Sequence, residues 1–157
     1  MNRKKTSIFV AAILMLHCML VGCSVNQGDI SDCTYWNSDN FITNGDYIEF
    51  PCDYGILKYP ARWINSLTIE CWDNNGTKVD IFYYADGEKK AEIARLSFGT
   101  KDGFLVGNVE DCEISLRLGD IQAEQWSESD VLNYCAMQED INEMLAHLTE
   151  LEGFTQN

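Results

Sequence analysis

The chain has 157 residues, of which 25 are acidic and 11 are basic, and its formal net charge is −14. This balance excludes a nucleic-acid-binding protein, because binding to phosphates requires a basic stripe that the sequence lacks. It also excludes electrostatic adhesion to an anionic lipid surface.

The N-terminal segment has the order of an export signal. Residues 3–5 are basic, residues 8–20 form a short apolar run, and Leu-Val-Gly-Cys closes it at 20–23. The stretch 8–22 is shorter than the roughly 20 residues that cross a bilayer, so a transmembrane anchor is the weaker alternative. The segment resembles the bacterial lipobox. This resemblance implies cleavage between Gly22 and Cys23, acylation of Cys23 (palmitate or a similar chain), and a lipid-anchored protein on the extracytoplasmic face of the cell membrane.

Removal of residues 1–22 would leave 8 basic and 25 acidic residues, a formal charge of −17. A chain of this length buries roughly two thirds of its unfolded surface, which is enough for one core. We expect a tether at 23–46 and a single domain at 47–157. Five cysteines would remain besides Cys23, so at least one thiol stays outside any intramolecular disulfide. They are Cys33, Cys52, Cys71, Cys112 and Cys135.

Three aromatic residues interrupt the polar tether: Tyr35, Trp36 and Phe41. Two interpretations are open. The favoured one is that they dock on an edge of the domain, because an exposed aromatic cluster promotes aggregation. The other is that they form a platform for a glycan or a peptide.

The domain is predicted to be rich in strands. Short strands are expected at 47–50 and 55–59, followed by one helical turn through Trp63, because Tyr59-Pro60 bends the chain. Longer strands are expected at 67–72, 78–85, 91–98, 104–109 and 112–118, with a hairpin turn at 73–76. Turn signals between successive strands predict an antiparallel meander sheet.

A long amphipathic helix is predicted to follow the strands. Ser127 is its expected N-cap and Gly153 its stop. One face carries an apolar stripe, and Glu139, Glu143 and His147 are expected on the opposite face. The stripe consists of Tyr134, Met137, Ile141, Met144, Leu145, Leu148 and Leu151. We therefore expect an α+β fold with this helix packed on one face of the sheet.

Two segments resemble known proteins. YGILKYPARW at 54–63 is similar to the opening of PsbP-like domains, which implies an α/β sandwich with antiparallel sheets. Together with YCAMQEDIN at 134–142, it resembles a group of uncharacterised lipoproteins of clostridia-like Gram-positive bacteria. Neither resemblance implies a catalytic residue or a ligand.

The sequence offers little for catalysis. His17 lies in the export signal, and His147 is expected on the solvated side of the helix, where a water-excluding pocket does not form. Glu139, Glu143 and His147 have helical spacing that could hold a metal ion, but a solvated acidic face is the favoured interpretation. The serine-hydrolase, zinc-protease and phosphate-loop motifs are absent from the sequence. We expect no catalytic residue, no metal and no cofactor.

The sequence thus favours a lipid-anchored binding or accessory module without catalysis. Its partner would be an exported protein or a glycan, and its membrane contact would be the lipid on Cys23. One alternative is a carboxylate-based enzyme acting on glycans. Another is an inhibitor or immunity-type protein, whose acidic surface would steer an exported partner.

Overall fold

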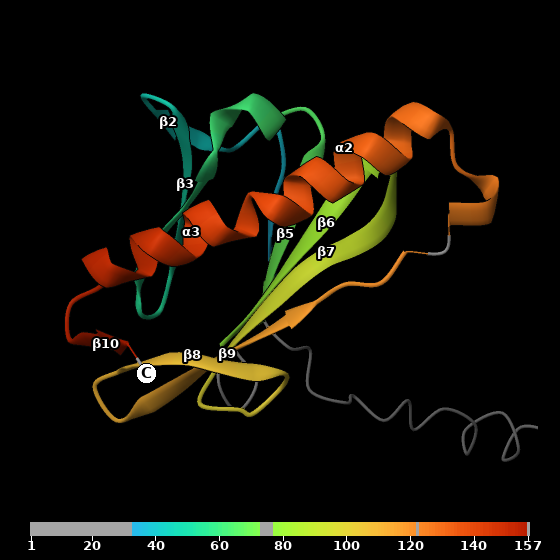
Figure 1. The fold of residues 1–157 in the computed structure, drawn as a ribbon. Helices are drawn as coiled ribbons and strands as arrows, with labels where there is room; N and C mark the ends of the chain where they lie inside the picture. The colour runs from blue at the N-terminus through green and yellow to red at the C-terminus, as the bar shows by residue number, and fades with distance from the viewer. Residues whose placement is uncertain (1–32, 73–76, 122, 157) are drawn as a thin grey trace, which may run out of the picture. The chain divides into compact units, whose positions relative to one another are not determined.

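A computed structural model describes residues 33–72, 77–121 and 123–156 (Figure 1). The export signal, Cys23, and the hairpin turn predicted at 73–76 lie outside the described residues. Within the described part of the chain, no helix is long and apolar enough to cross a membrane.

The strands form two antiparallel sheets. The larger sheet has seven strands in the order β1-β5-β6-β7-β9-β8-β10. These are β1 (Cys33–Trp36), β5 (Leu67–Trp72), β6 (Lys78–Ala85), β7 (Glu88–Phe98), β8 (Phe104–Val109), β9 (Cys112–Leu118) and β10 (Phe154–Gln156). The smaller sheet consists of β2 (Ile42–Asn44), β3 (Tyr47–Cys52) and β4 (Gly55–Pro60), in that order. A 3₁₀ turn at Ala61–Trp63 follows β4, as predicted.

The prediction of a single meander is correct only for β5, β6 and β7. After β7 the chain passes over to β8, and β9 returns between β8 and β7. The strands β2, β3 and β4 form a sheet of their own, and the predicted tether contributes both β1 and β2. Alternation along one segment identifies a strand, whereas its neighbours depend on contacts with distant segments.

The predicted helix is present as one helical run over 128–150, with an irregular turn at Asp140. α2 spans Glu128–Glu139, α3 spans Ile141–His147, and a 3₁₀ turn at Leu148–Glu150 follows. At the irregular turn, the Asp140 carboxylate accepts a 2.5 Å hydrogen bond from Trp63 Nε1 and lies 2.5 Å from the Arg62 guanidinium. The turn after β4 thus holds the junction between the helices. Ser127 caps α2 as predicted, accepting a hydrogen bond from the main chain of Asp130.

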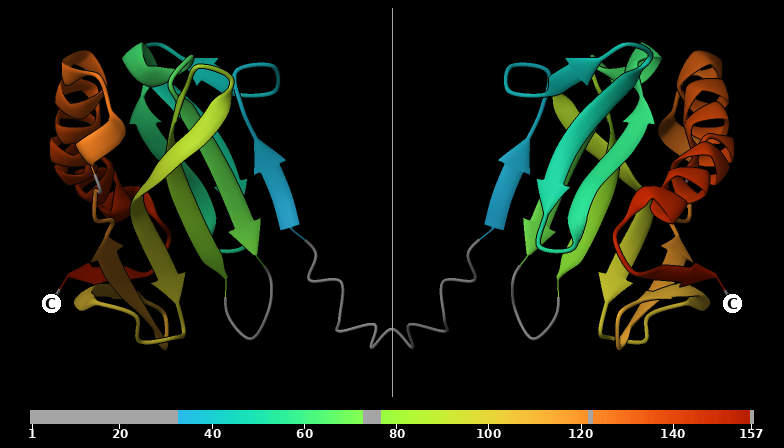
Figure 2. Two further views of the ribbon diagram at one scale, coloured as in Figure 1. Left: turned by 90° about the vertical axis from the view of Figure 1, so that its right-hand side faces the viewer. Right: turned by 90° about the vertical axis from the view of Figure 1, so that its left-hand side faces the viewer.

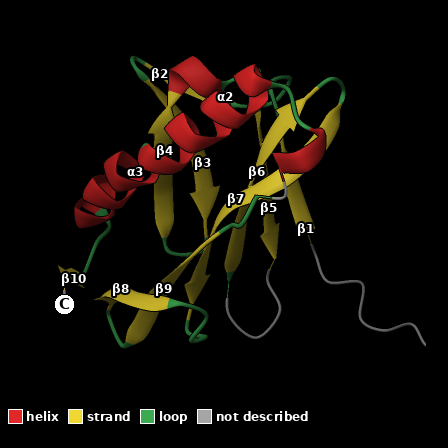
Figure 3. Cartoon of the chain, turned by 45° about the vertical axis from the view of Figure 1, so that its right-hand side comes forward, coloured by secondary structure: helices red, strands yellow, loops and turns green. Residues whose placement is uncertain are grey.

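Both sheets and the helical segment contribute to one hydrophobic core. Tyr134, Met137, Ile141, Met144 and Leu148 of the predicted stripe are each at most 1 % exposed. They share this core with β3 and β4 and with the central strands of the larger sheet. In Figures 2 and 3 the helical segment lies to one side of the strands. The α+β class is therefore confirmed.

Candidate functional site

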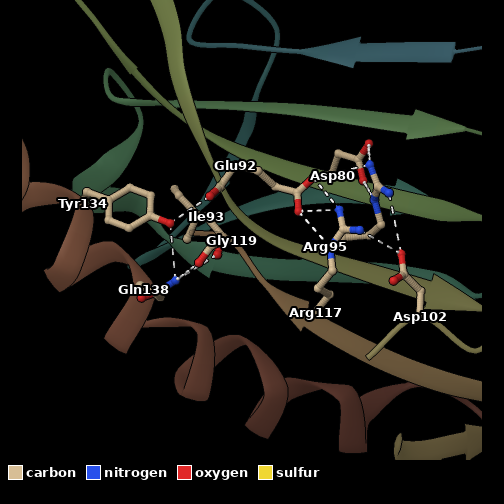
Figure 4. Close-up of polar contacts among 9 residues, drawn as sticks. All are labelled: Asp80, Glu92, Ile93, Arg95, Asp102, Arg117, Gly119, Tyr134 and Gln138. Carbon is tan, nitrogen blue, oxygen red and sulfur yellow. Dashed lines mark hydrogen bonds and ion pairs between the residues drawn. The ribbon is translucent and has the colours of Figure 1, made fainter. Parts of the chain in front are cut away.

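The most connected polar cluster is an ion network on the larger sheet (Figure 4). Asp80 on β6, Arg95 on β7 and Arg117 on β9 are direct cross-strand neighbours. Arg95 Nη2 lies 2.9 Å from Asp80 Oδ2, and Arg117 Nη2 lies 2.8 Å from Glu92 Oε1. Asp102, in the turn after β7, lies 3.6 Å from Arg95 and 3.5 Å from Arg117. The network therefore joins three carboxylates to two guanidinium groups.

These pairings favour a structural role for the network. Asp80 is buried and is bound through both of its oxygens by Arg95, and this hydrogen bonding raises the pKa of the guanidinium. A carboxylate that acts as general base needs an accessible lone pair directed at a substrate, whereas these lone pairs are directed at arginine. The network thus stabilises the register in which β6, β7 and β9 pair.

The helix is tied to the same part of the sheet. The Tyr134 hydroxyl donates a 2.9 Å hydrogen bond to the main-chain carbonyl of Glu92, and Gln138 Nε2 donates to that of Gly119 at the same distance. Burial raises the pKa of Tyr134 to about 12, so its hydroxyl keeps the proton that it donates. Glycine at 119 lets the chain after β9 run close to β7, because a Cβ there would lie 1.7 Å from the carbonyl oxygen of Glu92.

A second polar cluster joins α3 to the smaller sheet, and it corrects the expected position of His147. Its imidazole packs edge-on against the Tyr47 ring, with centroids 4.5 Å apart, and its Nδ1 lies 2.6 Å from Glu150. The Tyr47 hydroxyl donates a 3.0 Å hydrogen bond to Glu143. His147 is therefore largely covered by the smaller sheet, whereas the Glu143 side chain bonds to Tyr47 and remains 40 % exposed. The helical wheel assigns this side of α3 to water because it does not include β3 and β4. Glu139 is exposed as predicted.

This second cluster is also neutralised by ion pairs. Lys58 of β4 lies 2.5 Å from Glu150, and Arg62 lies 3.6 Å from Glu143. No group of three or more histidine, cysteine or acidic side chains is placed to hold a metal ion in the ranges that the structure describes.

A groove of about 560 Å³, lined by both apolar and polar side chains, lies between α3, β8 and β10. Leu105 and Val106 of β8 form one wall, Leu145 of α3 a second, and Phe154 of β10 a third. The remaining lining residues are Asn142, Ala146, Leu148, Thr149 and Gln156. A β-bulge between Leu105 and Gly107 explains how the consecutive residues Leu105 and Val106 both reach this groove, since neighbours on a regular strand point to opposite faces.

Glycine allows β10 to close one end of the groove. A Cβ on Gly107 would lie 2.6 Å from the Phe154 ring, so only glycine lets this ring lie against β8. At the start of β8, Phe104 is 60 % exposed and Leu105 is 42 % exposed. Exposed apolar side chains on β8 thus adjoin a groove, and this combination is typical of an interaction site.

A smaller hollow of about 250 Å³ lies beside the ion network. Trp72, Lys78, Asp80 and Arg95 line it. An aromatic ring next to polar, planar groups could stack on and hydrogen-bond to a sugar.

The predicted site residues are distributed over the chain. Tyr35 and Trp36 are consecutive on β1, opposite Glu70 and Ile69, so they point to opposite faces of the sheet. Trp36 and Phe41 are half-buried and pack against the core, whereas Tyr35 is 41 % exposed. The structure thus does not bring the three rings together. Gly22 and Cys23 lie outside the described residues.

Sequence reasoning missed the groove, although one signal for it was present. Phe104, Leu105 and Val106 are three consecutive apolar residues after a turn, where apolar residues of an edge strand normally alternate with polar ones.

Comparison of the sequence with protein-family models, curated proteins and solved structures finds no match in any of the three.

Proposed function

We propose that this chain is an extracytoplasmic lipoprotein, anchored through the lipid on Cys23, whose domain is a binding module for an exported protein. The observation that carries the proposal is the groove between α3, β8 and β10, whose wall includes the exposed Leu105, together with the exposed Phe104 next to it on β8. Burial of such side chains drives protein association, at roughly 25 cal/mol for each Å² of apolar surface.

The charge of the domain supports a basic partner. Most of its basic side chains are already within 4 Å of a carboxylate, as is true of Lys58, Arg62, Lys89, Lys90, Arg95 and Arg117. After residue 22 the chain has 25 acidic residues and 8 basic ones. Near the groove, the exposed Glu110 donates its main-chain N–H to Gly153 just before β10. This excess negative charge would steer a cationic protein toward the surface.

The ion pairs count against the alternative of a carboxylate-based enzyme. Glycoside hydrolysis requires one protonated and one ionised carboxyl group facing the sugar. Asp80, Glu92 and Asp102 instead face Arg95 and Arg117. In this proposal the segment from α2 to α3 serves as the layer that covers one face of the sheets, and its buried stripe supports that role.

A glycan is the second candidate ligand, and the hollow beside Trp72 and Arg95 favours it. Titration calorimetry with soluble oligosaccharides tests this candidate, with Trp72→Ala as the variant. A saturable heat of binding that Trp72→Ala abolishes would support a glycan ligand. If no heat of binding is measured, a protein is the one remaining candidate partner.

Crosslinking on intact cells tests the binding function. Phe104 is replaced by benzoylphenylalanine, and Leu132, which is 63 % exposed on α2, is replaced in the same way as a control. We expect illumination to give a discrete protein adduct at 104 and none at 132. No adduct at either position, or the same adducts at both, would contradict the proposal.

The anchor is tested separately. The mass of the N-terminal peptide should show acyl groups on Cys23, and Cys23→Ala should release the protein from the membrane fraction. An unmodified Cys23 in the purified wild-type protein would contradict the anchor without affecting the groove.

A further inference from the structure

The groove adjoins a sheet edge that is only half covered. β10 pairs antiparallel with β8, and the partners run from Phe154 opposite Val109 to Gln156 opposite Gly107 (Figure 1). The first half of β8, residues 104–106, lies along β9 on its other side. Among the residues that the structure describes, no strand lies beside this half on the side of β10. Within the described residues, the ladder between β10 and β8 therefore covers only the half of β8 from Gly107 to Val109.

This uncovered half has the β-bulge between Leu105 and Gly107 but carries no charged side chain and no proline. Natural edges carry lysine, proline or other charged residues that prevent pairing with another chain. Here the edge consists of Phe104, Leu105 and Val106. An added strand could hydrogen-bond to the main chain of these residues and pack against their apolar side chains, as in known cases of strand addition.

The groove supplies the side-chain pocket that strand addition requires. Leu105 and Val106 belong both to the uncovered edge and to the wall of the groove. A strand laid beside them would direct every second side chain toward Leu145 and Phe154 across the groove. A bound helix could fill the groove but could not pair with the main-chain groups of 104–106 that face away from β9, because helical main-chain groups are bonded internally.

Charge selects the source of the strand. A second copy of the processed chain would bring its own formal charge of −17 to the same edge, so pairing between copies is opposed by repulsion. A basic segment is attracted instead. We propose, on the basis of the function proposed above, that the partner contributes an extended segment with apolar residues at alternate positions and flanking basic residues. This segment adds to β8 beside Phe104–Val106 and inserts an apolar side chain into the groove.

The test uses the full-length chain, purified in detergent, and a labelled short peptide in which valine and threonine alternate between flanking lysines. Fluorescence anisotropy should show saturable binding below about 1 mM. A second peptide, N-methylated at alternate residues, cannot form one of its two rows of main-chain hydrogen bonds and should bind at least roughly tenfold more weakly, as should a peptide flanked by glutamates.

Protein variants locate the site. Leu105→Asp should weaken binding of the lysine-flanked peptide at least roughly tenfold, whereas Leu132→Asp, at a comparably exposed leucine, should leave it unchanged. Hydrogen exchange should show new protection at residues 104–106 when the peptide is bound. Circular dichroism of each variant confirms that it is folded.

The outcomes separate this inference from the function on which it rests. No saturable binding, equal binding of the N-methylated peptide, or equal effects of the two aspartate variants would overturn strand addition. If a specific adduct still forms at 104 on cells, the groove binds a partner in another conformation and the proposed function survives. Dimerisation of the chain that Leu105→Asp abolishes would identify a second copy as the occupant and would also overturn the inference.

Discussion

The hydroxyl of Tyr59 on β4 donates a 2.6 Å hydrogen bond to the main-chain carbonyl of Met137 in α2. Tyr59 is fully buried, and desolvation raises the pKa of its hydroxyl well above the ordinary value, so the proton stays on the oxygen. The bond joins the smaller sheet to the helix three residues before the irregular turn at Asp140.

Tyr59→Phe removes this donor and leaves a buried carbonyl without its partner. We expect the free energy of unfolding to fall by about 1–3 kcal/mol. Urea denaturation measures the loss. Tyr35→Phe, at a ring that is 41 % exposed, is the matched control and should change stability by less than about 0.5 kcal/mol. Equal losses of unfolding free energy in both variants would show that the hydrogen bond to Met137 does not contribute to stability.

The ion network should contribute to stability and not to chemistry. Asp80→Asn removes the charge that faces Arg95, whose side chain is 23 % exposed. Breaking a buried pair costs about 3–5 kcal/mol, and partial solvation of this arginine reduces the expected loss to about 2–4 kcal/mol. Asp86→Asn serves as the control, because that carboxylate is 76 % exposed beside Lys90 and should matter by less than about 0.5 kcal/mol. If Asp80→Asn left the free energy of unfolding unchanged, the structural role of the network would be contradicted.

The acid stability of the protein should depend on Glu150. A hydrogen bond from Lys58, and to a lesser extent one with His147, lowers the pKa of this carboxyl below its ordinary 4.5. Because the folded pKa lies below the unfolded one, the stabilisation is present above about pH 4.5 and is lost as the pH falls through the folded value. In Glu150→Gln, the urea midpoint should therefore fall less between about pH 5 and pH 3 than in the wild type. The exposed neighbour Glu152, changed to glutamine, should keep the wild-type slope. A wild-type slope in Glu150→Gln would refute the assignment.

The helical stripe predicts a further stability difference. Ile141 is 1 % exposed at the start of α3, so Ile141→Asp buries an unpaired charge and should cost several kcal/mol. Glu139→Ala, on the exposed side of the last turn of α2, should cost less than about 0.5 kcal/mol. Glu143 would be a poor control, because it accepts the hydrogen bond from Tyr47. Similar losses in Ile141→Asp and Glu139→Ala would mean that the stripe does not face the core.

Local chemistry made most of the elements predictable. Alternation identified β5 and β9, the Tyr59-Pro60 bend identified the turn at Ala61–Trp63, and the Ser127 cap identified the start of α2. Each of these signals lies within a few neighbouring residues. Non-local contacts were not predictable in the same way. The position of β9 beside β7 depends on pairs such as Arg95 and Arg117, which are far apart in the sequence.

The same distinction explains the outcome for the site residues. The helical wheel placed His147 in water, because it contains no information about Tyr47, a residue of the smaller sheet that packs on it. The aromatic residues Tyr35 and Trp36 are adjacent in sequence, but strand geometry separates their side chains. The groove combines residues from β8, α3 and β10, and no local pattern contains all three.

The most direct test of the account is the affinity of the partner recovered by crosslinking at Phe104. Its dissociation constant is measured with the wild-type chain, with Leu105→Asp in the groove and with Leu132→Asp on the exposed side of α2. We expect binding at least roughly tenfold weaker for Leu105→Asp, unchanged binding for Leu132→Asp, and weaker binding of the wild type at higher salt. Equal dissociation constants for the two variants would contradict the proposed function.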